Sequence, residues 1–435
     1  MSVLASTPVF SDTEAAEFAA EFFGMSGRVT LLPGERDQNF LVTAESGRSC
    51  VLKIANAAED RSILEAQHHA MDFLGQHVSF CPKTVPAQNG DYLVEVRSEK
   101  TGTHLVRLVS YIQGTPMGLV KRRSPELFMD LGRSLARMDR ALAGFSHPAV
   151  HRDFHWDLVN ASGVVNQYIT HVTDTRLRDL IQQCTREFEN TTLPLLQSLR
   201  KSVIHNDAND YNVLAGGGTD LYSKNQSVTG IIDFGDMVYS CTVCDPAIAA
   251  AYAVLDMPDP LQTAAQVVKG YHQTYPLGET EISVLFNLIC MRLCVSACLA
   301  AIQQKQRPDD PYLRISQAPI QKALPILAGI DPQFATVVFR SACGLDPFPK
   351  NRTVRTWLAK NRHLWFPVMG EPLIQETCTV LELGVDSPLV SGDPTAMAGD
   401  DFVRHLSARL KQTGAGYGIG RYKEARLRQS SFFQA

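Results

Sequence analysis

Two acidic segments of the sequence contain the residue types that phosphoryl transfer requires. The first, VIHNDANDYNVL at 203–214, places Asp207 two residues after His205 and Asn212 five residues after Asp207. The second is IIDFGD, in which Asp233 begins an Asp-Phe-Gly sequence. Phosphoryl transfer needs a base that orients the acceptor hydroxyl, ligands for Mg²⁺ and a cation on the phosphates. We therefore predict that Asp207 is the catalytic base and that Asn212 and Asp233 hold Mg²⁺.

A third segment, HRDFHWDLVN at 151–160, looks similar, but its spacing differs. The first Asn after Asp153 is Asn160, two residues later than the spacing of the first segment requires, and no Asp-Phe-Gly follows at hairpin distance. We therefore predict that this segment is not the catalytic loop. Trp156 and Asp157 are interpreted as scaffold, and a place on the substrate side is the alternative.

A cation for the phosphates stands upstream, in the strand-like run VLKI. Lys53 is the lone charge of this run, and a Lys that points inward needs an anionic partner. We predict that Glu65, in the following helix, is this partner and that the pair holds Lys53 against the nucleotide. The segment GERDQNFLV begins at Gly34, where a phosphate-covering turn belongs. A Lys that extends its charge to solvent is the simpler alternative for Lys53 alone.

The order of the predicted elements explains how these residues could meet. A capping-type start at Ser11 predicts a helix, which β-type runs, a second helix and two further strands follow. We expect residues 1–113 to form a small α+β nucleotide-binding lobe. Its last strand leads into a hinge at Ser110–Thr115, and we expect the backbone of Ser110 and Ile112 to bind the nucleotide base.

Helical patterns dominate after Gly114. Ser124 is a predicted N-cap with Pro125 at the first turn, and apolar residues then recur at spacings of three or four. Further helices are expected at about 174–200, 245–256, 259–275, 279–304 and 316–329. We predict a helical lobe over 114–340 that carries the catalytic loop and the substrate site. Residues 341–435 are rich in Pro and Gly and are interpreted as an extension or connector.

Composition argues for an ordinary globular chain. Hydrophobic residues make up 45% and charged residues 20% of the 435 residues. The net charge of 41 − 45 = −4, without a Lys/Arg run, makes nucleic acid and anionic membranes poor partners. The N-terminus lacks the basic and apolar regions of a secretory signal, and ten cysteines then fit reduced thiols in the cytoplasm.

The most apolar segment, 283–302, is long enough to raise the question of a membrane span. It contains Asn287 and Arg292, and an Arg near the centre of a bilayer costs about 2.5–3.5 kcal/mol. We interpret the segment as a buried helix. Three cysteines share one face of it: Cys290, Cys294 and Cys298. Packing against a neighbouring helix is the preferred explanation for this face, and a metal site is the alternative.

These motifs resemble the aminoglycoside phosphotransferase/choline kinase superfamily. HNDANDYN, IIDFGD, VLKI, the EAQHHAMDFL helix, the LVRLVSYIQG strand and HRDFHWDL occur in matching order over roughly residues 10 to 340. The chain is most similar to hydroxylysine kinases and to the kinase-like domains fused to class III aminotransferases. The family's usual His-Gly-Asp is His-Asn-Asp here. The resemblance implies a bilobal protein-kinase-like fold, α+β in class. It also implies transfer of the γ-phosphate of ATP or GTP to a hydroxyl of a small amine or amino acid.

The C-terminal GIGRYKEARLRQSSFF resembles the connector that precedes peptidase-like and aminotransferase domains in such fusions. The sequence has neither a zinc-peptidase pattern nor a pyridoxal phosphate site, so we expect a fragment or a chain that keeps only the kinase part. Linked peptidase-like and aminotransferase domains are thus expected partners. A kinase-like module without strong catalysis and an aminoglycoside phosphotransferase are the alternatives, the latter not supported by the spread of Arg residues.

The resemblance suggests an acceptor that is a hydroxylated, cationic amino acid, and a few residues could bind it. Asp236, directly after Asp-Phe-Gly, and Asp207 would place negative charge near its ammonium groups, with Asp157 as a third acid. Arg152 or Arg176 would hold its carboxylate as a bidentate fork. The alternative is that Arg152 and Asp157 form ion-paired scaffolding and that Asp236 caps the next segment.

Overall fold

The computed structural model describes residues 7–34, 36–306 and 317–347, together with 349, 356, 360, 373–374 and 379–380. Contacts divide the chain into two units, Met1–Cys343 and Gly344–Ala435. In the second unit the described residues include one short antiparallel pair, β12 (Leu373–Ile374) with β13 (Thr379–Val380). Most of the predicted extension therefore lies outside the described residues, and its role stays a prediction.

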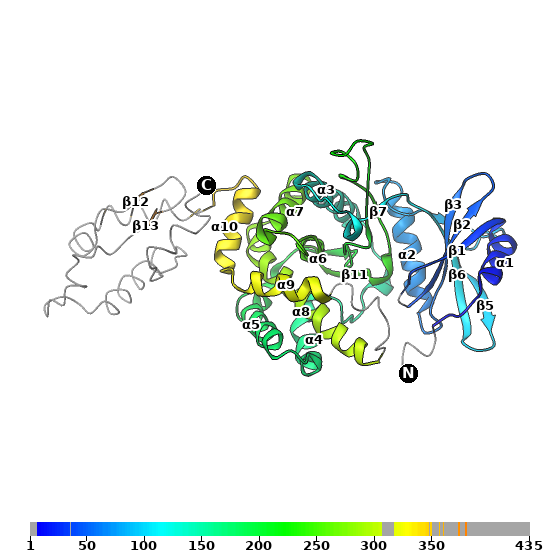
Figure 1. Cartoon of the computed structure of the whole chain (residues 1–435), viewed down its shortest axis with the longest axis horizontal. Helices are drawn as coiled ribbons and strands as arrows, with labels where there is room; N and C mark the ends of the chain where they lie inside the picture. The colour runs from blue at the N-terminus through cyan, green and yellow to red at the C-terminus, as the bar shows by residue number, and fades with distance from the viewer. Residues whose placement is uncertain are drawn as a thin grey trace. The chain divides into compact units, whose positions relative to one another are not determined.

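The small lobe is built on an antiparallel sheet with the strand order β1-β2-β3-β6-β4, and β5 pairs with β6. Its strands are β1 (Gly27–Leu32), β2 (Gln38–Ala44), β3 (Ser49–Ile54), β4 (Thr84–Val85), β5 (Val94–Ser98) and β6 (Gly102–Ser110). Two helices accompany the sheet, α1 (Asp12–Phe23) and α2 (Arg61–Leu74). In Figure 1, α1 covers one side of the sheet and α2 lies between the sheet and the helical lobe.

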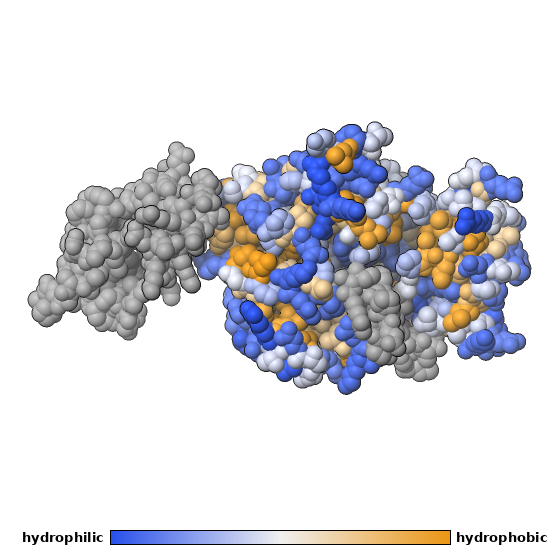
Figure 2. Space-filling view, in the orientation of Figure 1, coloured by the Kyte–Doolittle hydropathy of each residue, from blue (hydrophilic) through white to orange (hydrophobic). Residues whose placement is uncertain are grey.

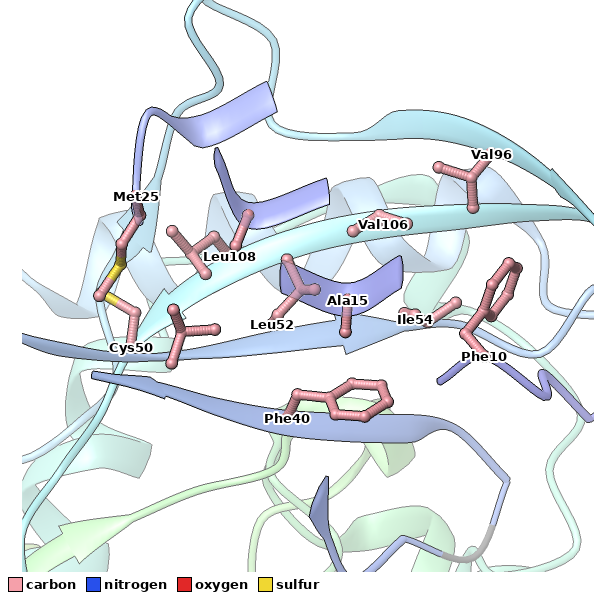
Figure 3. Close-up of a cluster of buried hydrophobic side chains, with 12 residues drawn as sticks. Phe10, Ala15, Met25, Phe40, Cys50, Leu52, Ile54, Val96, Val106 and Leu108 are labelled. Carbon is pink, nitrogen blue, oxygen red and sulfur yellow. The ribbon is translucent and has the colours of Figure 1, made fainter. Parts of the chain in front are cut away.

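The core of the small lobe lies on the α1 side of the sheet. Figure 3 shows Ala15 of α1 among side chains of the strands, including Phe40, Leu52, Val106 and Leu108. Side chains alternate between the two faces of a strand. Because Leu52 is buried in this core, the next residue of β3, Lys53, points to the opposite face of the sheet, toward α2 and the helical lobe.

The predicted N-terminal helix is confirmed together with its cap. The hydroxyl of Ser11 accepts from the backbone N–H of Glu14, and the carboxylate of Glu14 accepts from the N–H of Ser11. Gly24 ends the helix with φ 62°, a left-handed conformation that glycine adopts without strain. The end of α1 thus depends on local residues alone.

The helical lobe contains α3 (Pro125–Leu142), α4 (Ala161–Tyr168), α5 (Thr175–Thr191), α6 (Cys244–Ala253), α7 (Pro260–Thr274), α8 (Glu279–Gln306), α9 (Gln317–Ala328) and α10 (Pro332–Ala342). Helix α3 begins at the predicted cap, where Ser124 accepts from Leu127 N–H. It packs tightly on α7, because a Cβ at Gly132 or at Gly270 would collide with the backbone of the other helix. Helices α4 and α10 were not predicted.

Helix α8 is the long apolar segment of the sequence and lies inside the helical lobe. Within the described part of the chain it alone is long and apolar enough to cross a membrane, but 89% of its most apolar window is buried. Asn287 donates to the hydroxyls of Thr191 and Thr192 at 2.9 and 3.0 Å, which satisfies its amide. Elsewhere, hydrophilic and hydrophobic patches alternate on the visible face of the molecule (Figure 2).

Two small sheets of the second lobe frame the acidic segments. Strand β8 (Lys201–Ile204) pairs with β11 (Val238–Cys241), and β9 (Val213–Gly216) pairs with both β10 (Ser227–Ile231) and β7 (Thr115–Pro116). The loop 205–212 joins β8 to β9, and Asp-Phe-Gly follows β10 directly. Both acidic segments therefore begin at the end of a strand.

Candidate active site

A backbone hydrogen bond brings the two acidic segments together. The N–H of Ile232, just after β10, donates to the carbonyl of Asn212 at 2.9 Å. Asn212 is the last residue of the loop, and Asp233 is the next residue after Ile232. The two predicted metal ligands thus lie beside each other, although their roles stay predictions.

The carboxylate of Asp207 is held on both oxygens. Oδ2 accepts from Nδ2 of Asn209 at 3.0 Å and from Nδ2 of Asn212 at 2.7 Å, and Oδ1 accepts from Nη2 of Arg292 at 2.7 Å. The side chain is still 21% exposed, so a ligand can reach it. Burial and the nearby Asp236 raise the pKa of Asp207, while Arg292 opposes this rise. The protein therefore orients a carboxylate of increased basicity.

Asn209 is a loop residue that the sequence analysis overlooked. Its Oδ1 accepts from the N–H groups of Tyr211 and Asn212 at 2.8 and 3.0 Å, and its amide nitrogen bonds Asp207. Asn favours such local side-chain turns. The sequence signal for this role was the position of Asn209 two residues after Asp207.

Arg292 is the most important residue that sequence reasoning missed. It comes from the middle of α8, its side chain is 1% exposed, and its guanidinium lies 4.6 Å from the ring centroid of Trp156 and 5.4 Å from that of Tyr252. Two aromatic faces and one carboxylate, Asp207, offset the cost of burying the charge. The signal in the sequence was a cation inside an otherwise apolar helix.

The backbone of the loop is anchored by a buried acid of α6. Asp245 accepts from the N–H groups of His205 and Asn206 at 3.0 and 2.6 Å. A second buried acid, Asp139, forms a side-chain hydrogen bond with Asp245 and accepts from the hydroxyl of Tyr271 at 2.7 Å. Burial, and next the charge of Asp245, raise the pKa of Asp139 well above its usual range. Asp139 therefore retains a proton to higher pH than an ordinary Asp does.

Lys53 and Asp233 meet across the two lobes. Nζ of Lys53 lies 3.4 Å from Oδ1 of Asp233, and the side chains are 12% and 45% exposed. Lys53 points this way because its neighbours in β3 are buried in the core on the other face. Lys53 is the main cause that lowers the pKa of Asp233. Asp233 is thus an ionised, accessible carboxylate next to a cation.

Arg107 adds a second cation that was not predicted. It is the cross-strand neighbour of Lys53 in the β3–β6 pair and is 2% exposed. Its Nε and Nη1 atoms have no hydrogen-bond partner in the described part of the chain. Burial lowers the pKa of Arg107, and the charges of Asp37, Asp233 and Glu59 raise it. The sheet face behind Asp233 therefore carries two positive charges.

The turn between β1 and β2 is compact and reaches the helical lobe. A Cβ at Gly34 would collide with the carbonyl of Asp37, so the turn requires glycine there. The N–H of Asn56, at the end of β3, donates to Oδ1 of Asp37 at 3.1 Å and pins the turn. Nη2 of Arg36 lies 2.5 Å from Oδ1 of Asp236. The predicted phosphate-covering turn thus lies above the Asp-Phe-Gly segment.

The two residues of the hinge that were predicted to bind the nucleotide base, Ser110 and Ile112, differ in their hydrogen bonds. Among the described residues, the backbone N–H and carbonyl of Ile112 take part in no hydrogen bond. Ser110 is tied to Lys83, whose carbonyl accepts from the N–H of Ser110 and whose N–H donates to its hydroxyl. Ile112 is therefore free to bind a base edge, and Ser110 first of all fixes the strand.

Comparison with known proteins identifies the family. A family model described as the phosphotransferase enzyme family (APH) matches residues 28–279, more than half of the chain. The chain belongs to this family. It is a phosphotransferase that acts on a hydroxyl group, as its relatives also indicate.

Hydroxylysine kinases are among the relatives of this phosphotransferase. The protein of Bos taurus is 30% identical over 329 residues, which cover 71% of this chain and 87% of that protein. The protein of Danio rerio is 30% identical over 327 residues, which cover 73% of this chain and 91% of that protein. Predicted membership in the superfamily, close to the hydroxylysine kinases, is confirmed.

Solved structures confirm the predicted bilobal kinase-like fold of the phosphotransferase. An amicoumacin kinase in complex with AMP-PNP and Ca²⁺ has a TM-score of 0.56 at 16% identity, over 75% of this chain and 97% of that chain. A microcompartment-associated aminopropanol kinase has a TM-score of 0.51 at 18% identity, over 77% and 99%. At these identities the likeness concerns the fold alone.

The structure explains why this phosphotransferase has His-Asn-Asp in place of His-Gly-Asp. Asn206 has φ 65°, in the left-handed region that Gly adopts freely and Asn tolerates. Its Nδ2 donates to the carbonyl of Asp236 at 3.2 Å, which a glycine could not do. The ring of His205 packs against Phe234 with centroids 4.8 Å apart. The substitution thus keeps the backbone shape and adds a link between the two segments.

The prediction that Glu65 pairs with Lys53 is wrong. Glu65 is 44% exposed and lies 3.6 Å from Arg61 in the same helix, whereas Lys53 pairs with Asp233. The buried face of α2 contains Leu64 and His68 instead. Residues one position apart on a helix are 100° apart, so Glu65 is turned away from the cleft.

Two predicted acceptor-binding residues have other partners in the structure. Arg152 donates from Nη2 to the carbonyls of Gly235 and Met237 at 2.8 and 3.1 Å. Asp157 is 4% exposed, and its Oδ1 accepts from the hydroxyl of Ser240 at 2.6 Å. Arg152 and Asp157 thus brace the segment after Asp-Phe-Gly, which agrees with the interpretation of Asp157 as scaffold and speaks against the alternative in which it faces the substrate.

Arg176 and Asp236 differ in their environments. Arg176 is exposed in the first turn of α5, and none of the contacts among the described residues connects it with the loop 205–212. Asp236 lies beside that loop, 7% exposed and covered by Arg36. Asp236 therefore remains a candidate for acceptor binding, and Arg176 lacks support.

The phosphotransferase offers two oxygen ligands for a divalent cation that nucleotide phosphates would complete. Asp233 is ionised and accessible, and Asn212 bonds Asp207 through its nitrogen, so that its Oδ1 has no hydrogen-bond partner among the described residues. These hard donors fit Mg²⁺. Within the described residues, no group of three or more His, Cys, Asp or Glu side chains could hold a metal by itself. The cysteines of α8 instead contact Cys184 of α5 through Cys290 and Cys294.

Proposed function

We propose that this phosphotransferase is a kinase that transfers the γ-phosphate of ATP or GTP to the hydroxyl of a small hydroxylated amine or amino acid. Hydroxylysine is the acceptor that the relatives favour. The observation that carries the proposal is that three residues from both lobes converge: Lys53 pairs with Asp233, and Asp207 offers an accessible carboxylate. A weakly catalytic module would not need this complete set.

In the proposed reaction Asp207 orients the acceptor hydroxyl and takes its proton as the oxygen attacks the γ-phosphorus. The bond between the γ-phosphorus and the bridging oxygen breaks, and the nucleoside diphosphate leaves. Lys53 and Arg107 offset the negative charge of the phosphates from the small lobe. A divalent cation, Mg²⁺ by preference, held by Asn212 and Asp233 would neutralise further phosphate charge when bound.

The acceptor is proposed to be cationic. Asp207 and Asp236 lie on the helical-lobe side of the site, and a carboxylate at Asp236 is the ordinary partner of an ammonium group. Arg152 is occupied by backbone carbonyls, so we assign it no acceptor carboxylate. We further propose that the enzyme works in the cytoplasm. Linked peptidase-like and aminotransferase domains also remain a proposal.

A coupled nucleotide-release assay tests this function. Hydroxylysine, smaller hydroxylated amines, neutral alcohols and aminoglycosides are assayed with ATP and with GTP in Mg²⁺. We expect turnover with hydroxylated amino compounds, at least tenfold above neutral alcohols, and loss of that turnover in Asp207→Asn. Equal turnover of neutral alcohols would reject a cationic acceptor, and no turnover of any alcohol would reject the kinase.

A further inference from the structure

An ion pair joins the phosphate-covering turn to the candidate acceptor site. Arg36 belongs to the turn between β1 and β2, and its Nη2 lies 2.5 Å from Oδ1 of Asp236, 200 residues later in the chain. The side chain of Arg36 is 39% exposed and that of Asp236 is 9% exposed. Arg36 is therefore accessible to a ligand, and it covers a carboxylate that is almost fully buried.

Arg36 is surrounded by acidic side chains, one of which is also the partner of Lys53. The charges that act on it are, in decreasing order, those of Asp236, Glu59 and Asp233. Asp233 is also the partner of Lys53. A Cβ built on Gly235 would lie 3.2 Å from Oδ1 of Asp233 and 3.7 Å from Nη2 of Arg36, so the guanidinium that pairs with Asp236 also lies near Asp233.

The two acids differ in what else holds them. Asp233 has Lys53 as a partner and its own Gly235 N–H as a donor. Among the described residues, the ion pair with Arg36 is the one direct contact of the Asp236 carboxylate, because Asn206 bonds only the Asp236 backbone carbonyl. If Arg36 moves away, the carboxylate of Asp236 loses its direct ion pair, and the more distant charges of Arg152 and Arg292 still act on it.

We propose that Arg36 links the two substrate sites: the γ-phosphate of a bound nucleotide draws Arg36 away from Asp236 and frees this carboxylate for the ammonium group of the acceptor. This inference rests on the proposed function. Phosphate competes with carboxylate for one guanidinium because both accept its paired N–H groups. A nucleoside diphosphate, which lacks the γ-phosphate, leaves the ion pair in place.

The proposal makes nucleotide and acceptor binding mutually reinforcing. A nucleotide that breaks the ion pair increases the affinity for the acceptor, and the acceptor must increase the affinity for that nucleotide by the same factor. The enzyme would then engage the acceptor amine mainly when a triphosphate is present. Arg36 is thus assigned two ligands, the γ-phosphate and Asp236, in alternate states.

A double-mutant cycle tests the ion pair without any acceptor. Calorimetric titrations of the full chain with AMP-PNP, GMP-PNP and the matching diphosphates in Mg²⁺ are made for wild type, Asp236→Asn, Arg36→Ala and the double variant. We expect Asp236→Asn to tighten binding of the triphosphate analogue about fivefold and of the diphosphate less than twofold, which is the scale of one part-buried ion pair. In the Arg36→Ala background the same change has no such effect. If Asp236→Asn tightened triphosphate binding equally with and without Arg36, the cause would be the loss of a negative charge near the phosphates, and the proposal would be overturned.

A second titration measures the link to the acceptor. Hydroxylysine is titrated with and without saturating AMP-PNP, and wild type is expected to bind it about fivefold tighter with the analogue. In Arg36→Ala this ratio falls to about one, while Arg48→Ala, an exposed Arg at the other end of the β2–β3 hairpin, retains it. If wild type phosphorylates hydroxylysine but binds it equally well with and without AMP-PNP, the role of Arg36 is refuted and the proposed function stands. Absence of any acceptor turnover would refute the proposed function, and the double-mutant cycle would still decide the ion pair.

Discussion

Nη2 of Arg292 donates to Oδ1 of Asp207 at 2.7 Å, from the middle of an apolar helix to a carboxylate of the loop 205–212. The guanidinium is enclosed by Trp156 and Tyr252 and cannot turn to solvent. It therefore fixes one oxygen of Asp207 and limits the rise of its pKa, while the loop amides fix the other oxygen. A residue that looked incompatible with its helix is thus a partner of the reactive group.

Replacement of Arg292 tests this relationship. In Arg292→Met the cation is lost at similar volume, so the pKa of Asp207 rises further and the ascending limb of the pH–activity profile moves to higher pH. We expect kcat at neutral pH to fall at least about tenfold, with loss of up to about 3–5 kcal/mol of stability because the buried pair loses one partner.

Arg200→Met is the matched control for Arg292→Met. Arg200 pairs with Glu281 at 3.2 Å and lies 3.9 Å from the ring centroid of Tyr275, outside the site. This control should lower the melting temperature without a shift in the pH profile. An unshifted profile in Arg292→Met would contradict the role of Arg292.

The pH dependence of the unmodified enzyme is the second prediction. In the proposed reaction the ionised form of Asp207 is the base, and burial raises its pKa, so kcat/KM should increase with pH above the range in which an ordinary Asp, with a pKa of about 3.9, is already ionised. Steady-state rates between about pH 5 and pH 9 measure this limb. Asp207→Asn should lower kcat roughly 10²–10⁴-fold and leave nucleotide affinity nearly unchanged. A flat wild-type profile over this range would argue against Asp207 as the base.

Lys53 and Glu65 provide a matched pair of substitutions for the third prediction. Lys53→Met removes the cation beside Asp233, and we expect kcat/KM for the nucleotide to fall about 10²-fold. Glu65→Gln removes only an exposed pair with Arg61, so activity should stay within about twofold and stability within about 0.5 kcal/mol. Steady-state titration of the nucleotide compares the two variants. If both variants lost kcat/KM to a similar extent, the result would indicate that Lys53 and Glu65 form an ion pair in the working enzyme.

The buried acid pair under the loop gives the fourth prediction. The raised pKa of Asp139 means that the folded state binds a proton that the unfolded state has already lost above about pH 4. The free energy of unfolding therefore decreases as pH rises, and Asp139→Asn should remove this part of the decrease. Urea unfolding at about pH 5.5 and pH 8 compares the two slopes.

Asp245→Asn is the contrasting variant for the acid pair. Both oxygens of Asp245 accept backbone N–H groups of the loop, and an amide nitrogen cannot accept. This variant should lose both stability and activity, whereas Asp139→Asn keeps activity. An unchanged pH slope in Asp139→Asn would show that Asp139 is ionised in the folded enzyme.

Local features of the fold were predictable because they depend on near neighbours. The capping box at Ser11, the N-cap at Ser124 and the alternating burial of β3 all follow from residues within a few positions. The same holds for Asp207 and Asn212, which one loop turns toward each other at 2.7 Å. Glu65 shows the limit of such local prediction. It is one position away from the buried Leu64, and this rotation of 100° about the helix axis turns it away from Lys53.

The order of the elements, the loop 205–212 and the Asp-Phe-Gly segment can be predicted from the amino-acid sequence, since short-range spacing and family-like motifs specify them. The charges that surround these segments become known only from the folded chain. Arg292 reaches Asp207 across 85 residues, and Arg36 reaches Asp236 across 200. A buried or covered charge is stable only beside its counterion, and which counterion is near depends on how distant helices and strands pack, which no local pattern records.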